Sequence, residues 1–412
     1  MAEQQPAEQA QTVTPWEVHG ATVGGQQLGI DYDRLIAQFG TRPIDSALLE
    51  RFAALTGRPP HRFLRRGVFF SHRDLASILD RYEQGKPFYL YTGRGPSSDS
   101  MHLGHMVPFV FCKWLQDVFD VPLVIQLTGI HALPPELTLE QCHSFAYENA
   151  KDIIACGFDV RKTFIFSDLD FVGGPFYHNV VRFARAITAN QVKATFGFDN
   201  SSNVGKYHFV AVQAAPSFSN SFPHIFGEKK DIPCLIPCAI DQVYVALTCR
   251  LTIKDPYFRL TRDVAVKLKY PKPALIHAKF FPSLQGSQTK MSASVDTSAI
   301  FMNDTPKQIE KKINKYAFSG GRTTLEEQKE FGGNTEVDVA YQYLSFFMDD
   351  DEKLEEIGQG YRNGRIMTGE LKKMCIEVLK EFVGDFQAKK KQLTKELVFE
   401  YMKPRALEWG KS

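Results

Sequence analysis

The sequence lacks a strong excess of either charge. Its 412 residues include 49 Lys and Arg and 47 Asp and Glu, so the formal net charge at pH 7 is only +2. Domains that bind nucleic acids through their overall charge are usually much more basic. The balance therefore excludes a nucleic-acid partner held by bulk charge, and any contact with RNA must use local basic patches.

The sequence also has few features of secreted, membrane or zinc proteins. No apolar run reaches the length of a membrane-spanning helix. Residues 1–12 contain neither arginine nor an apolar stretch, so we expect no leader peptide and a disordered tail over 1–14. The seven cysteines are scattered, and Cys234 and Cys238 lack a second pair. We therefore expect a reduced, cytoplasmic protein with no protein-bound structural metal.

A strand, a tight turn and a helix are predicted within residues 87–114. The apolar run at 88–91 ends at Gly-Arg-Gly-Pro, and apolar residues then return at helical spacing. The sequence HLGH at 102–105 lies at the start of this helix, where free N–H groups attract phosphate. Gly104 would let a ligand approach the backbone closely. Taken alone, this motif is explained equally well as a structural turn with two surface histidines.

A second motif stands at 286–294, where GSQTKMSAS forms a small polar segment with one lysine. In this order, HLGH and KMSAS resemble the HIGH and KMSKS motifs of the class I aminoacyl-tRNA synthetases. Longer strings, such as PFYLYTGRGPSS, FIFSDLD, QAAPSFSNSFP and PCAIDQ, are similar to the eukaryotic cytosolic tryptophanyl-tRNA synthetases. The resemblance implies a cytoplasmic homodimer that uses ATP and Mg²⁺ to ligate L-tryptophan to tRNA(Trp).

The expected fold is α/β, with a doubly wound parallel sheet of the Rossmann type over residues 86–303. Continuous apolar runs, as parallel sheets require, predict further strands at 121–128, 162–168, 234–240 and 274–281. Thr138 and Gln141 form a capping box for a helix that should stop at Gly157. Ligands are expected at the carboxyl ends of the strands.

Two further parts are expected from the resemblance. Residues 15–85 correspond to an extension packed on the catalytic core, and residues 304–412 correspond to a helical anticodon-binding domain. Thr305, Pro306 and Gln308 predict the start of the first helix of that domain. Its lysine runs are expected to be exposed, namely Lys311, Lys312, Lys389, Lys390 and Lys391. Most such runs are simply solvated faces, but in this family the domain binds the anticodon.

The resemblance also implies roles at ATP. His102 and His105 would hold the phosphates, while Lys290 would stabilise charge as pyrophosphate leaves and Ser292 would add a hydrogen bond. The other residues expected at ATP are Thr92, Arg94, Gly104, Asp241 and Met291.

The pocket for the amino acid is expected at the strand ends. An indole N–H needs an acceptor, whereas a phenol is best recognised by a carboxylate, so the neutral acceptors Tyr91 and Gln126 favour tryptophan. A tyrosine-specific relative is therefore the weaker alternative, and a buried glutamine with a purely structural partner is another. The resemblance adds three residues to this pocket: Thr128, Gln213 and Gln242.

Two stretches depart from the family pattern. Residues 129–136 (GIHALPPE) replace an acidic segment, so that His131 takes the place of a glutamate that meets the substrate ammonium. Residues 243–254 (VYVALTCRLTIK) are inserted between the CAIDQ and DPYFR strings, and a retained intron is one hypothesis for them. The alternative to an active ligase is therefore a catalytically impaired or mis-spliced variant that keeps only the binding of ATP and tRNA.

Overall fold

The computed structural model describes residues 11–13, 18–19, 22–23, 26–27, 30–96, 98–128, 137–239, 256–290 and 296–409. The chain forms two compact units. The first, called the sheet unit, comprises Asp33–Ser100, Pro108–Lys279 and Gln392–Ser412. The second, called the helical unit, comprises Met1–Tyr32, Met101–Val107 and Phe280–Lys391.

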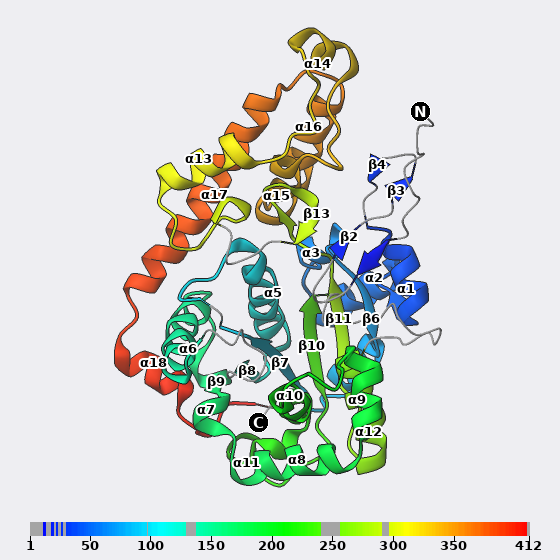
Figure 1. Ribbon diagram of the computed structural model, residues 1–412, viewed down its shortest axis with the longest axis vertical. Helices are drawn as coiled ribbons and strands as arrows, with labels where there is room; N and C mark the ends of the chain where they lie inside the picture. The colour runs from blue at the N-terminus through cyan, green and yellow to red at the C-terminus, as the bar shows by residue number, and fades with distance from the viewer. Residues whose placement is uncertain are drawn as a thin grey trace. The chain divides into compact units, whose positions relative to one another are not determined.

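The sheet unit is built around a seven-stranded sheet in the order β5-β6-β11-β10-β7-β8-β9 (Figure 1). Its strands are β5 (Arg42–Pro43), β6 (Phe69–Arg73), β7 (Tyr89–Arg94), β8 (Leu123–Leu127), β9 (Thr163–Ser167), β10 (Cys234–Ala239) and β11 (Ala274–Ala278). The strands from β11 to β9 are parallel, while β6 pairs antiparallel with β11 and with β5. The predicted α/β sheet is therefore confirmed, with two added antiparallel strands at one edge.

The order of the strands identifies where a ligand should bind. From β7 the chain continues to β8 and β9 on one side, and then returns to β10 and β11 on the other. The direction of winding thus changes between β7 and β10. In open α/β sheets, ligands bind at the carboxyl ends of the strands beside such a switch point.

Helices surround this sheet, and several begin where the sequence predicts. The helices that belong wholly or mostly to the sheet unit are α1 (Tyr32–Phe39), α2 (Ser46–Thr56), α3 (Arg62–Arg65), α4 (Leu75–Glu83), α5 (Leu103–Phe119), α6 (Leu139–Ile154), α7 (Asp168–Phe171), α8 (Gly174–Arg185), α9 (Ala189–Phe196), α10 (Val204–Ala214), α11 (Pro223–Phe226), α12 (Pro256–Leu268) and α18 (Lys395–Met402). Thr138 and Gln141 form the predicted capping box of α6. Gly157 follows the end of α6 with a φ of +87°, a backbone conformation that favours glycine. Helix α5 begins in the helical unit and continues in the sheet unit from Pro108.

The core of the sheet unit is largely aromatic. Phe164 and Phe166 on β9 are both at most 2% exposed, and their rings lie 5.6 Å apart. Phe222 packs against Phe166 with ring centroids 5.7 Å apart. All five residues of β8 and all five of β9 are buried, because helices cover both faces of a parallel sheet. This explains why the sequences of these strands are mostly apolar throughout and do not alternate between apolar and polar residues.

The helical unit contains five α-helices after residue 300: α13 (Pro306–Tyr316), α14 (Leu325–Phe331), α15 (Val339–Phe347), α16 (Asp351–Arg362) and α17 (Thr368–Lys391). Its described strands are short: β1 (Thr12–Val13), β2 (Val18–His19), β3 (Thr22–Val23), β4 (Gln26–Gln27), β12 (Pro282–Ser283) and β13 (Gly286–Lys290). Thr305 and Gln308 form the capping box predicted for α13, with Pro306 in its first turn. Helix α17 packs against both α13 and α15.

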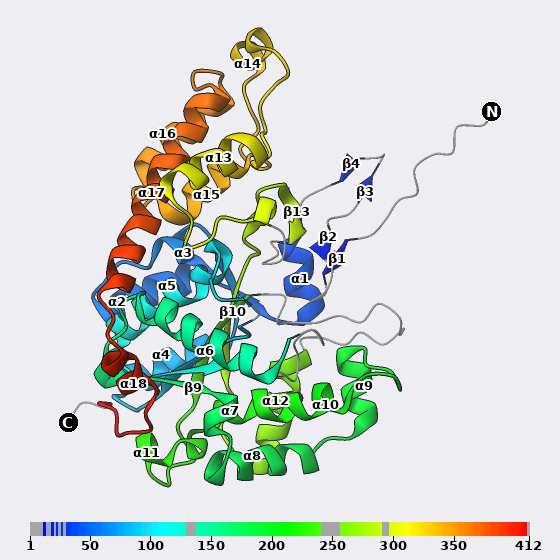
Figure 2. The same ribbon diagram turned by 60° about the vertical axis from the view of Figure 1, so that its left-hand side comes forward.

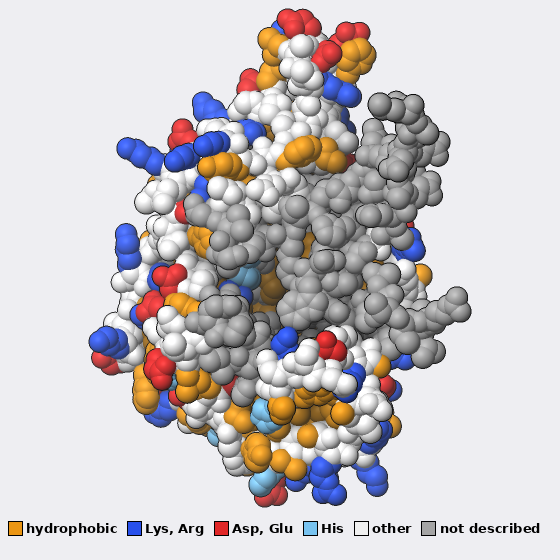
Figure 3. Space-filling model, in the orientation of Figure 1, with side chains coloured by type: hydrophobic (Ala, Val, Ile, Leu, Met, Phe, Trp, Pro, Cys, Tyr) orange, Lys and Arg blue, Asp and Glu red, His pale blue; other side chains and the backbone are white. Residues whose placement is uncertain are grey.

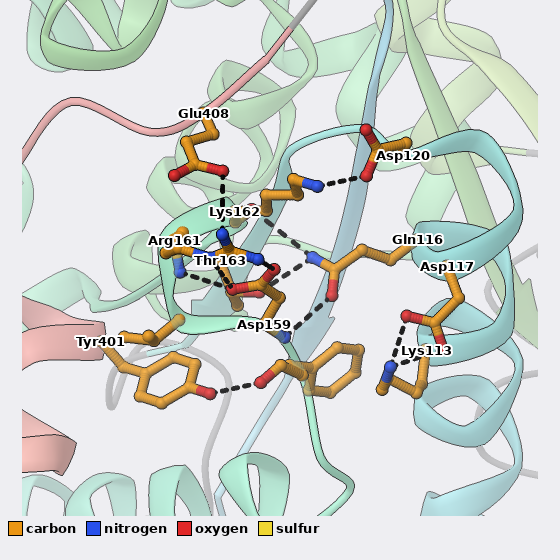
Figure 4. A network of polar contacts seen from close by, with 12 residues as sticks. Lys113, Gln116, Asp117, Asp120, Asp159, Arg161, Lys162, Thr163, Tyr401 and Glu408 are labelled. Carbon is orange, nitrogen blue, oxygen red and sulfur yellow. Dashed lines mark hydrogen bonds and ion pairs between the residues drawn. The ribbon is translucent and has the colours of Figure 1, made fainter.

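The end of the chain belongs to the sheet unit. Helix α18 lies beside β9 and α6 (Figure 1 and Figure 2). The Tyr401 hydroxyl donates to the carbonyl of Phe158, and Arg405 donates to the carbonyl of Thr163 at 3.0 Å. Gln116 on α5 supports the same loop from inside, donating to the Thr163 hydroxyl at 2.9 Å (Figure 4). Residues 392–412 are thus grouped with the sheet, while the predicted domain boundaries at 86–303 and 304–412 stay a prediction.

One lysine predicted to be exposed is buried. The ammonium of Lys312 lies 2.9 Å from a carboxylate oxygen of Asp304, and each side chain is only 5% exposed. The same ammonium lies 4.9 Å from the ring centroid of Phe301. The prediction was wrong here because Lys312 lies on the face of α13 that carries the buried Ile309 and Ile313. The other four lysines are exposed or half-buried: Lys311, Lys389, Lys390 and Lys391.

Replacing Lys312 with methionine should lower the free energy of unfolding by about 3–5 kcal/mol. The methionine fills much of the same volume, but the carboxylate of Asp304 then stays buried without its cation. Lys311→Met on the exposed face of α13 is the matched control and should change stability by less than about 0.5 kcal/mol. Urea unfolding followed by circular dichroism measures both, and a loss as small as that of the control would contradict the importance of the pair.

Candidate functional site

The predicted site residues fall into three groups. The sheet unit contains Tyr91, Thr92, Arg94, Gln126, Thr128 and Gln213. The helical unit contains His102, Gly104, His105 and Lys290, of which the Lys290 side chain is not described. Four predicted residues lie outside the described part of the chain: Asp241, Gln242, Met291 and Ser292.

A chain of hydrogen bonds joins three buried side chains, one from within β7, one near the end of β8 and one directly after β9. The Tyr91 hydroxyl donates to Oε1 of Gln126 at 2.6 Å. Nε2 of Gln126 donates to Oδ1 of Asp168 at 2.8 Å. Tyr91 is 2% exposed, Gln126 0% and Asp168 5%. The structure thus brings the two predicted pocket residues together and adds a carboxylate that was not predicted.

The charge state of this chain follows from its burial. Removal from water raises the pKa of Tyr91 well above its usual value, and the nearby carboxylate of Asp168 raises it further. The phenol is therefore protonated at neutral pH and acts as a donor. Its hydroxyl also lies 3.1 Å from the main-chain carbonyl of Gln213. Sequence reasoning assigned the Gln213 side chain to the pocket, but the contact with Tyr91 is made by the backbone.

This arrangement offers a neutral hydrogen-bond acceptor, the amide oxygen of Gln126, in a buried position. An amide oxygen has two lone pairs, and Tyr91 uses one of those on Gln126. The second lone pair can accept an N–H from a ligand. Asp168 was missed because its role depends on a neighbouring strand. The available signal was a carboxylate directly after the apolar run of β9, where a buried charge requires a partner.

Arg94, at the end of β7, is held by a residue that the sequence did not single out. Its Nε donates to Oδ1 of Asn149 at 3.2 Å, and Asn149 in turn donates to the carbonyl of Ser98 at 2.8 Å. Burial lowers the pKa of Arg94 to about 10, which leaves the guanidinium charged at neutral pH. Among the residues that the structure describes, its buried Nη2 has no hydrogen-bond partner. Such a nitrogen is suited to an anion such as a phosphate.

The two predicted threonines make contacts with the backbone. The Thr92 hydroxyl lies 3.5 Å from the carbonyl of Pro237, which joins β7 to β10 at the switch point. The Thr128 hydroxyl lies 3.4 Å from the carbonyl of Arg94, and its N–H donates to the same oxygen at 2.8 Å. These bonds hold the strand ends in register, and a role of either hydroxyl toward a ligand stays a prediction.

The histidines of the HLGH motif lie against each other in the helical unit. Their imidazole rings are stacked, with centroids 3.4 Å apart and an angle of 21° between the planes. Leu103 donates to the carbonyl of Ile300 at 3.0 Å, and Met302 donates to that of Met101 at 2.8 Å. His102 is only 5% exposed. The alternative of two surface histidines is therefore wrong for His102, which is part of a paired, packed segment.

Gly104 is closely packed within the motif itself. A Cβ at this position would lie 3.2 Å from Cε1 of His102 and 3.4 Å from Cβ of Phe281. Contacts of that length are tighter than side chains usually make. Close packing therefore explains the glycine without a ligand, and its predicted approach to ATP stays a prediction.

Within the described ranges, no group of three or more His, Cys, Asp or Glu side chains is placed to hold a metal ion. Of the helices that the structure describes, none is both long and apolar enough to span a bilayer.

Comparisons with known proteins give a consistent result. The family model for class I tRNA synthetases (W and Y) matches residues 83–208 and 255–384, more than half of the chain. The chain is 62% identical to the cytoplasmic tryptophan–tRNA ligase of Schizosaccharomyces pombe, covering 97% of this chain and 99% of that protein. It is 58% identical to the human cytoplasmic tryptophan–tRNA ligase, covering 96% and 82%. The crystal structure of Plasmodium falciparum tryptophanyl-tRNA synthetase superposes with a TM-score of 0.83 at 47% identity, covering 91% and 98%.

Replacing Asn149 with alanine should lower the free energy of unfolding by about 1–3 kcal/mol. The change removes the Asn149 partner of the Arg94 Nε and of the Ser98 carbonyl, both in partly buried positions. Ser144→Ala, on an exposed position of the same helix, should change stability by less than about 0.5 kcal/mol. Thermal unfolding of the two variants compares them, and equal melting temperatures would show that Asn149 does not hold Arg94.

Proposed function

Because the chain belongs to the class I tRNA synthetases of the tryptophan and tyrosine family, we propose that it ligates L-tryptophan to tRNA(Trp) using ATP. A carboxylate oxygen of tryptophan attacks the α-phosphorus of ATP, so that an acyl–phosphate bond forms and pyrophosphate leaves. A terminal hydroxyl of the tRNA then attacks the carbonyl carbon, and AMP leaves with the bonding electrons. Relatives that are named tryptophan–tRNA ligases, at 62% and 58% identity, support this proposal.

One observation supports tryptophan as the substrate, namely the uncharged amide oxygen of Gln126, to which the Tyr91 hydroxyl donates. A buried amide oxygen with one lone pair in use can receive an indole N–H at the other. A tyrosine side chain has no ring N–H, and its phenol is recognised best by a charged acceptor. Thr128, Gln213 and Gln242 complete the proposed pocket, with the last of these outside the described residues.

The phosphates of ATP are proposed to meet positively charged and N–H groups. Arg94 supports this role, because its buried Nη2 lacks a partner among the residues described. His102, His105 and Lys290 are proposed to hold the phosphates and to neutralise charge as pyrophosphate separates. Thr92, Gly104, Asp241, Met291 and Ser292 are proposed as further ATP contacts. Mg²⁺ is proposed to enter with the nucleotide, where it would neutralise phosphate charge.

The tRNA is proposed to contact the helical unit. Lys307, Lys311 and Lys315 recur at helical spacing and are all exposed, so they form one basic face of α13. Figure 3 shows basic side chains gathered over the region of α13 and α17. A row of lysines can contact successive phosphates of an RNA strand even when the net charge is small. We also propose a homodimer, on the family resemblance, and a location in the cytoplasm, as the names of the two ligases state.

The alternative of an impaired or mis-spliced variant receives no support from these comparisons. The two departing stretches, 129–136 and 243–254, lie outside the described residues. Tryptophan-dependent exchange of pyrophosphate into ATP decides between the two, with tyrosine as the comparison substrate. Exchange with tryptophan and not with tyrosine is expected. Absence of exchange, together with its appearance in a variant that lacks 243–254, would overturn the proposal in favour of the alternative.

Replacing Lys290 with alanine should reduce the rate of tryptophan-dependent exchange more than tenfold. The lysine charge is proposed to act on the phosphates as they separate, so the affinity for tryptophan should stay nearly unchanged in isothermal titration. Lys329→Ala, at an exposed position of α14, is the control and should leave exchange unaltered. Equal losses in tryptophan affinity and in exchange rate would contradict the role at phosphate.

A further inference from the structure

The amide of Gln126 lies between two groups of opposite hydrogen-bonding character. On one side, the Tyr91 hydroxyl donates to its Oε1 at 2.6 Å. On the other side, Oδ1 of Asp168 accepts from its Nε2 at 2.8 Å. All three side chains are at most 5% exposed, so water does not compete for these bonds. The amide is therefore held at both ends.

The two ends of a glutamine amide have nearly the same shape, so shape alone does not decide which end faces a ligand. An ionised carboxylate can only accept hydrogen bonds. Oδ1 of Asp168 accepts from the NH₂ at 2.8 Å, so the amide turns its NH₂ toward that side and its oxygen toward Tyr91. Tyr91 does not enforce this orientation by itself, because its O–H can also donate to the main-chain carbonyl of Gln213 at 3.1 Å.

We propose that Asp168 is a positioning residue for substrate recognition: it holds the carbonyl oxygen of Gln126 toward the ring N–H of the amino acid. This inference rests on the proposed placement of tryptophan at Gln126. Without the carboxylate, the amide can turn over and present its NH₂ to the ring N–H, which sets a donor against a donor. The selectivity for a ring that carries an N–H would then depend on Asp168, which acts through Gln126.

Asp168 is placed firmly enough for this role. It follows directly after β9, all of whose residues are buried, and it begins the short helix α7. Ser167 caps that helix by accepting from the N–H of Leu169 at 3.2 Å. The second acid of the same helix, Asp170, points elsewhere: it is 49% exposed and lies 2.9 Å from Nε2 of His143. The helix thus supplies a matched control for the loss of a carboxylate.

The test compares two substrates in the variants Asp168→Asn and Asp170→Asn of the full chain. The substrates are L-tryptophan and its analogue with sulfur in place of the ring N–H, which has a similar shape and no donor. Pyrophosphate exchange gives kcat and KM for each. Asp168→Asn should lower kcat/KM for tryptophan roughly tenfold to a hundredfold and leave that of the analogue nearly unchanged. Asp170→Asn should leave both unchanged.

A second substitution tests the orientation directly. Adding Gln126→Glu to Asp168→Asn exchanges the acceptor and the donor, since the carboxylate then stands at position 126 and the amide at position 168. The double variant should recover preference for tryptophan over the sulfur analogue. Gln126→Glu alone should not, because two carboxylates would then face each other.

Three outcomes would overturn the inference. If wild type prefers tryptophan and Asp168→Asn keeps the full preference, the amide is oriented by something else. If Asp168→Asn weakens both substrates equally and the double variant recovers nothing, the role of Asp168 is only structural. If wild type itself does not prefer tryptophan over the analogue, the placement of the ring at Gln126 fails, and the inference fails with it. The first two outcomes overturn the role of Asp168 alone, whereas the third also overturns the placement of tryptophan at Gln126.

Discussion

The proposed recognition site depends on keeping a neutral amide oxygen available in a dry part of the sheet unit. Gln126 is fully buried on β8, so each of its polar atoms requires a partner. Tyr91 within β7 and Asp168 directly after β9 supply these partners. Parallel pairing of β7, β8 and β9 makes this possible, because it brings three carboxyl ends to the same edge. A ring N–H entering there would meet an acceptor that is already oriented.

The groups proposed to meet ATP are held by other contacts than Gln126. The guanidinium of Arg94 stands at the end of the central strand β7, with Asn149 holding one edge of it. The HLGH motif belongs to the helical unit, where its main chain pairs with residues 300–302. Asp304 and Lys312 form a buried ion pair that begins directly after this paired segment. The groups proposed to meet ATP are thus held by a side-chain amide and by main-chain contacts, whereas Gln126, proposed to meet the indole, is held by a phenol and a carboxylate.

Much of the fold could be predicted because it depends on short-range signals. The apolar runs at 121–128 and 162–168 contain β8 and β9, and the capping boxes at Thr138 and Thr305 mark the starts of α6 and α13. Such signals are carried by residues within one turn or one strand. The burial of Lys312 was not predicted, because a lysine on a helix is usually solvated and only its acid partner Asp304 makes burial possible. The docking of α18 on the sheet unit was not predicted for a similar reason, since it depends on contacts with β9.

The sequence by itself determined the family, the five parallel strands of the sheet, and the pair Tyr91 and Gln126 as candidates for the pocket. Motifs and periodicity carry that information because they are local. Only the tertiary structure decided that Asp168 faces Gln126, that Asn149 holds Arg94, and that His102 is buried rather than exposed. Each of these facts joins residues from separate elements. The direction of a hydrogen bond between two strands depends on which side chains meet there, and that is set by how the strands pair.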